Sequence, residues 1–189
     1  WLKDGLTPEE TDEAARWFGR LMGGTWEATR RMLYVQGCVF SDSSLMPVSF
    51  AHAFWLAEEK NSLKAWDPSK ADALAPDREH LEAALEEKKD AVERIAALCA
   101  ISQEPPAGIR PEKAGELAQR FAIHREYAKM YAAAVNALML TRYVRETEED
   151  RNSEYYRAIC RKRRQAVEAL ADWEIRLRRM AVETDYTPH

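Results

Sequence analysis

Apolar residues return every three or four positions through the second half of the chain, which is the spacing of one face of an α-helix. This spacing predicts a long amphipathic helix over 77–102 and a longer one over 111–148. A polar break at 148–153 precedes a third long helix that ends near residue 183. Because short connections cannot return the chain to its starting end, neighbouring helices must run antiparallel. We therefore predict an all-α fold with an antiparallel bundle of three long helices over 77–183.

The first 76 residues carry signals for shorter helices. A threonine, proline and glutamate at 7–10 match a capping box, which marks a helix start. Gly23-Gly24 is expected to end this helix, and a further helix over 47–60 has an unusually aromatic face. We expect residues 1–76 to form a cap of shorter, aromatic-rich helices on the bundle.

Composition agrees with one helical domain over 1–189, with 184–189 as a tail. The chain is 46% hydrophobic, which excludes a disordered protein, and its Gly and Pro are too few for a β-rich fold. The net charge of -4 lacks the basic excess typical of nucleic-acid binders. No apolar run approaches 18 residues, so we expect no membrane partner. These features leave the cellular location open.

The familiar catalytic and metal-binding motifs do not occur in this sequence. A metal site in a helical bundle usually needs Glu-x-x-His pairs, and none is present. Asp77 and His80 have that spacing, but Asp77 is more simply a helix cap. His124 lies on an apolar stripe and is expected to be a core histidine, while Cys99 and Cys160 are expected to pack in the core. We predict no metal site, no cofactor and no catalytic residue in this chain.

Eight basic residues gather on the last predicted helix, where they could form a ribbon that binds RNA or another anionic polymer. They are Arg157, Arg161, Lys162, Arg163, Arg164, Arg176, Arg178 and Arg179. The alternative is a solvated face, partly paired with the acidic residues between 79 and 93. Aromatic residues do not alternate with the basic ones, which makes the solvated face the preferred interpretation.

Long aromatic side chains and polar groups occur together between residues 34 and 67. Sugar-binding surfaces combine an aromatic face with polar neighbours, because a pyranose has one apolar face and a polar rim. His52, Trp55 and Trp66 are therefore candidates for a saccharide-facing rim. The alternative is that the aromatic residues of this segment seal the cap onto the bundle.

Three stretches of this segment, 34–40, 47–59 and 62–67, resemble the region that follows the catalytic barrel in α-glucuronidase-like glycoside hydrolases. In such enzymes a (β/α)8 barrel precedes a long helical region and carries both catalytic carboxylates. The resemblance implies that this chain is a noncatalytic helical C-terminal or accessory domain of a carbohydrate-active enzyme. Its expected partners are a catalytic barrel domain or a sister subunit, with a carbohydrate as a further ligand.

Two other functions follow from the residue pattern alone. A self-contained interaction module would form a homodimer, or bind a partner helix, through an exposed apolar stripe. An RNA-binding bundle would use the basic residues of the last helix, and its affinity would fall steeply with salt.

Overall fold

The computed structural model describes residues 1–36, 38–39 and 75–183, and these residues confirm the predicted all-α helical bundle. The described helices are α1 (Pro8–Leu33), α5 (Arg78–Ser102), α6 (Pro111–Glu146) and α7 (Glu154–Glu183). Directly after α1, β1 (Tyr34–Val35) pairs antiparallel with β2 (Cys38–Val39) in a short hairpin.

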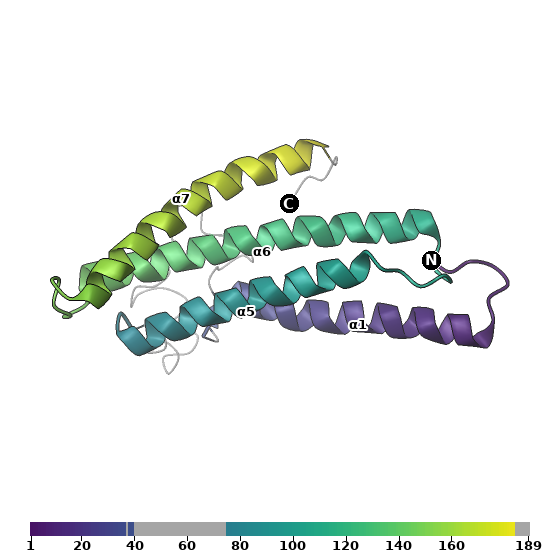
Figure 1. Cartoon of the computed structure of the whole chain (residues 1–189), viewed down its shortest axis with the longest axis horizontal. Helices are drawn as coiled ribbons and strands as arrows, with labels where there is room; N and C mark the ends of the chain where they lie inside the picture. The colour runs from purple at the N-terminus through teal and green to yellow at the C-terminus, as the bar shows by residue number, and fades with distance from the viewer. Residues whose placement is uncertain (37, 40–74, 184–189) are drawn as a thin grey trace.

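Successive described helices run antiparallel along one long axis (Figure 1). α1 packs on α5, α5 packs on α6, and α6 packs on α7. α7 meets the end of α6 and then diverges from it toward its own C-terminal half (Figure 1). α6 therefore lies between α5 and α7.

The middle of α6 is buried on all sides. Residues 130–135 are buried without interruption, and so are residues 137–140. A run longer than one turn points in every direction around a helix, so neighbours must cover every face of it. Four of these ten side chains are alanine, which lets the neighbouring helices approach closely. This segment of α6 is the centre of the bundle.

The ends of the long helices agree with the sequence pattern. The Asp77 side chain accepts a hydrogen bond from the backbone N–H of His80 at 2.9 Å, which makes it the N-cap of α5. Ser153 does the same for the backbone N–H of Tyr156 at 3.0 Å, at the start of α7. Thr7 and Glu10 form the predicted capping box of α1. Side-chain caps of this kind are readable from sequence because they act over three residues.

The predicted helix end at Gly23-Gly24 is wrong, because α1 continues through both glycines to Leu33. A Cβ atom added at Gly24 would lie 2.6 Å from the Leu98 side chain of α5, whereas one added at Gly23 would meet nothing within 4 Å. Gly24 therefore allows the close approach of α1 and α5 and does not end the helix. Packing against α5 outweighs the low helix propensity of the glycine pair.

A buried lysine of α5 forms hydrogen bonds with the C-terminal end of α1. The Lys88 ammonium donates hydrogen bonds to the carbonyl oxygens of Arg31 and Tyr34, and its Nζ lies 2.8 Å from a Glu87 carboxylate oxygen. Glu87 also accepts hydrogen bonds from the backbone and side-chain N–H groups of Gln36, at 3.0 and 2.9 Å. Burial lowers the pKa of Lys88, and Glu87 opposes this shift. The carbonyls that α1 leaves unpaired at its C-terminus thus receive a charged donor.

The two glycines give a matched test of this packing. We expect Gly23→Ala to stabilise the protein by about 0.5–1 kcal/mol, because alanine is the better helix former and the site is open. Gly24→Ala should be less stable than Gly23→Ala by at least about 1 kcal/mol, because Leu98 must move within the core. Urea unfolding of both variants measures the difference. Equal stabilisation by the two substitutions would contradict a close contact at Gly24.

Replacing Lys88 tests the cluster that ends α1. Lys88→Met keeps the aliphatic stem but leaves carbonyls and a carboxylate without their donor, so we expect a loss of about 3–5 kcal/mol in unfolding free energy. Lys89→Met is the control, since Lys89 is exposed and, among the described residues, forms its ion pair with Glu86 on the surface. A Lys88→Met protein as stable as the Lys89→Met protein would show that the ammonium is not required.

Candidate functional site

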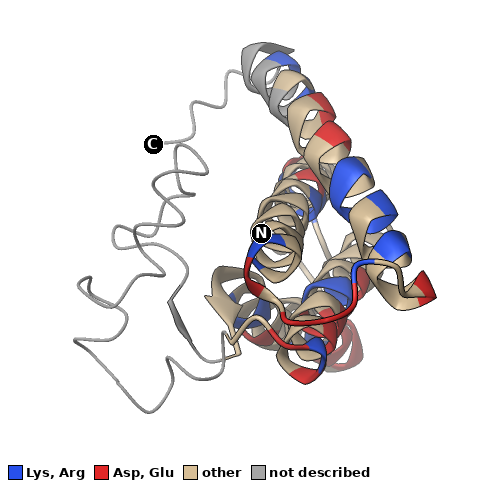
Figure 2. Ribbon diagram, turned by 90° about the vertical axis from the view of Figure 1, so that its left-hand side faces the viewer, with Lys and Arg blue, Asp and Glu red and all other residues tan. Residues whose placement is uncertain are grey.

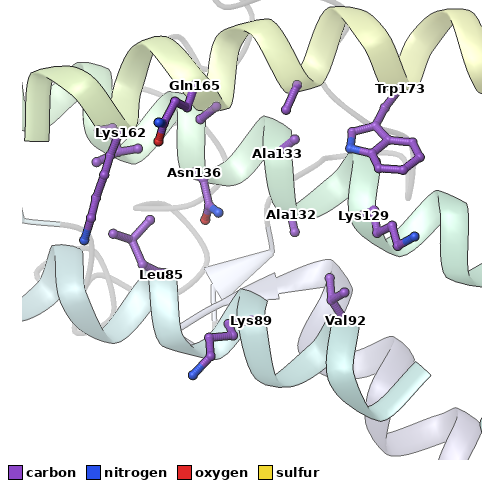
Figure 3. A pocket seen from close by; sticks show the side chains of 13 residues that line it. Leu85, Lys89, Val92, Lys129, Ala132, Ala133, Asn136, Lys162, Gln165 and Trp173 are labelled. Atoms are coloured by element: carbon purple, nitrogen blue, oxygen red, sulfur yellow. The ribbon is translucent and has the colours of Figure 1, made fainter. Parts of the chain in front are cut away.

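A groove of about 490 Å³ lies between α5, α6 and α7 (Figure 3). Each helix contributes residues three, four or seven positions apart, so each presents one stripe to the groove. The apolar lining residues are Leu85, Val92, Ala132, Ala133, Leu140, Ala166 and Ala169. The volume is within the range of ligand-binding clefts.

Small side chains on facing helices create this groove. Ala132 and Ala133 of α6 and Ala166 and Ala169 of α7 all line it, and longer side chains at these positions would occupy its volume. α7 also diverges from α6 beyond this region (Figure 1). The groove therefore follows from the sequence of two helices together with their relative direction.

One polar side chain lies in the apolar floor. Asn136 projects from α6 near Ala132 and Ala133 (Figure 3), and its Oδ1 is buried with no hydrogen-bond partner among the described residues. A buried amide oxygen without a partner is costly, by about 1–3 kcal/mol. The sequence analysis did not single it out, although Asn136 is the one polar residue between 131 and 140. That interruption of an apolar run is the signal that could have found it.

Cationic side chains surround the groove, and none of the described residues that line it is acidic. Lys89 and Lys129 each pair with a glutamate on their own helix, at 3.1 and 3.0 Å. Lys162 makes no ion pair with any residue that the structure describes. At one end of the groove, Trp173 has Lys129 Nζ 5.0 Å from its ring centroid and Arg176 at 4.7 Å. The groove thus combines an apolar floor with a positive rim.

α1 presents a second candidate surface, an exposed apolar flank made of Phe18, Met22 and Trp26. These residues are four positions apart and lie on one side of the helix. Trp26 is 72% exposed and Met22 is 52% exposed. Trp1 covers part of this flank, since its ring centroid lies 5.8 Å from that of Phe18. Large apolar side chains exposed in a row are typical of a surface that meets another molecule.

Several basic residues in the first half of α7 are exposed, but without the expected partners among the described residues. Lys and Arg follow one another along the first half of α7 (Figure 2). Arg157, Arg161 and Arg164 are exposed. The α5 carboxylates contact other groups: Asp90 pairs with Arg94 at 2.7 Å and with Arg31 of α1 at 3.1 Å. Among the described residues, the predicted pairing between α5 and the α7 ribbon does not form.

The three residues proposed for a saccharide-facing rim, His52, Trp55 and Trp66, lie outside the described residues. Their role stays a prediction.

The other sequence candidates have structural roles. Asp77 accepts from His80 Nδ1 at 2.6 Å as well as from the backbone, which confirms the cap interpretation. Cys99 is buried as predicted, whereas Cys160 is half-buried. Within the described part of the chain, no group of three or more His, Cys, Asp or Glu side chains could hold a metal ion.

His124 is half-buried and contacts another helix through one ring nitrogen, as the sequence predicts. Its Nε2 lies 3.3 Å from the Thr29 hydroxyl of α1. Burial lowers the pKa of the imidazole below its usual value of 6.5, so the neutral ring is favoured in the folded protein. This contact joins α1 to α6 directly.

Compared with known protein families, curated proteins and solved structures, the chain has no significant match. Within the described ranges, no helix combines the length and the apolar character needed to cross a membrane. The resemblance to α-glucuronidase-like enzymes therefore stays a prediction.

His124 predicts a pH dependence of stability. Because its folded pKa is lowered, the unfolded chain takes up a proton below about pH 6.5 that the folded protein resists. Stability should therefore be complete above that pH and fall as the pH drops toward the lowered folded value. His124→Gln keeps a hydrogen-bonding amide for Thr29 without titrating, so it should lose less stability between pH 7.5 and 5.5. Parallel losses in urea unfolding of the two proteins would contradict a buried, neutral His124.

Proposed function

We propose that this chain is a noncatalytic helical domain that packs on a second protein surface through the exposed apolar flank of α1. Following the resemblance in the 34–67 segment, the proposed setting is a carbohydrate-active enzyme, and the proposed partner is a catalytic barrel domain or a sister subunit. The observation that carries the proposal is the flank itself.

The apolar side of α1 is wider than the surface that the described bundle covers. Ala14, Trp17 and Leu21 are buried against the bundle. Phe18 and Met22, which directly follow Trp17 and Leu21, continue the apolar surface around the helix into solvent. A helix that packed only against the core would need one apolar stripe. The additional stripe supports a second packing surface.

Two glycines beside the flank support the same proposal. Gly19 and Gly23 are exposed, and an added Cβ at either one would meet nothing within 4 Å. Each costs about 1 kcal/mol relative to alanine inside a helix. The described part of the chain offers no compensating contact at either position. A partner backbone that approaches α1 closely would provide one.

Acidic substitutions on the flank test the proposal. Met22→Glu combined with Trp26→Glu places two carboxylates on the flank, and Val167→Glu combined with Ala171→Glu places two on exposed positions of α7, away from α1. We expect the flank variant, and not the control, to lose association while unfolding in urea like the wild type. Sedimentation velocity detects association with a sister subunit. Co-purification with a separately expressed neighbouring domain of the same reading frame detects association with a barrel.

Two results would contradict the proposal. One is a flank variant that associates as well as the wild type in both measurements. The other is robust glycosidase turnover by the 189-residue chain alone, because the proposal places the catalytic carboxylates elsewhere.

A further inference from the structure

We propose that the groove between α5, α6 and α7 binds an acidic amphipathic helix of a partner protein. This surface is separate from the α1 flank, so the inference does not depend on the partner proposed for that flank. It deepens the assignment of the chain as an interaction domain by naming the chemistry of a second partner.

The shape of the groove suits a helix. Its α6 stripe runs from Lys129 to Leu140 and its α7 stripe from Lys162 to Trp173, twelve residues or eleven residue-to-residue steps in each case. At 1.5 Å per residue this is about 16 Å, or three helical turns. The stripes face each other across an alanine-lined floor (Figure 3). Small residues on facing helices let an inserted helix approach the backbone closely, in the manner of helix-in-groove recognition.

The charge of the groove selects an acidic partner. Lys162 lies at one end, Lys129 near the other and Lys89 along one edge (Figure 3), and the described lining residues include no carboxylate. The Lys89–Glu86 pair joins neighbours on α5 at the surface, so its exchange for a partner carboxylate costs little. Glu126, the partner of Lys129, is buried and also pairs with Arg125, so Lys129 keeps its own partner while it contributes positive charge at that end. A helix with leucine on one face and glutamate along both flanks matches this arrangement, whereas a basic helix would meet like charge.

Trp173 provides a contact that a partner helix would complete. It is half-buried at the end of the groove, and tryptophan is among the residues that contribute most at protein interfaces.

Binding can be tested with two fluorescein-labelled peptides of about four helical turns, built from Leu and Ala with either Glu or Lys at the flanking positions. We expect the full chain to raise the fluorescence anisotropy of the acidic peptide, and to do so more weakly as salt is added. The basic peptide should not bind. Failure of the acidic peptide to bind, or equal binding of both peptides, would overturn the proposal.

Four variants locate the binding site. Lys162→Glu reverses a rim charge and Ala169→Phe fills the floor, and each should weaken binding of the acidic peptide about tenfold or more. Lys3→Glu and Ala171→Phe are the matched controls, because both positions are exposed and neither lines the groove. Circular dichroism and urea unfolding establish that each variant is folded. Equal affinity of the groove and control variants would overturn the proposal, even if the α1 flank variants behave as predicted.

Discussion

The structure depends on the complete burial of the middle of α6. Residues 130–140 are apolar except for Asn136, so every face of this segment carries apolar side chains. Exposing any of these faces to water would be unfavourable. The chain meets this constraint by placing α5 and α7 on either side of α6 in antiparallel order (Figure 1). Alanine-rich faces allow this close packing. Where the alanines of α6 and α7 face each other, their small side chains do not fill the space, and the groove results. The stability and the candidate binding site thus have the same origin.

α1 is attached to this centre by a few specific contacts as well as by its apolar stripe. Gly24 leaves space for the Leu98 side chain of α5, and the Trp17 indole N–H donates a hydrogen bond to the Ile101 carbonyl oxygen at 3.0 Å. Thr29 contacts His124, and Lys88 donates hydrogen bonds to backbone carbonyl oxygens at the C-terminal end of α1. These contacts occur from Trp17 to the C-terminal end of α1. They fix one side of the helix and leave the Phe18–Trp26 side exposed apart from the contact between Trp1 and Phe18.

The sequence was sufficient for the long helices because their signals are local. Apolar spacing and side-chain caps place the starts of α5 and α7 within one residue, and α6 ends at Glu146 beside the predicted polar break. Gly23-Gly24 misled the analysis because the reason for Gly24, the Leu98 side chain, lies more than 70 residues away in the chain. The role of Lys88 could not be read for the same reason, although its place among apolar positions was visible. The groove and the flank could not be predicted from the sequence, because both depend on which helix stripes are covered. That in turn depends on how the four described helices pack.

Hydrogen exchange of the native protein, followed for each backbone amide, tests the central role of α6 most directly. If burial of α6 organises the bundle, the slowest amides should lie between residues 128 and 143, with faster exchange toward the diverging C-terminal half of α7. Exchange in the middle of α6 that is as fast as in that half of α7 would contradict the account.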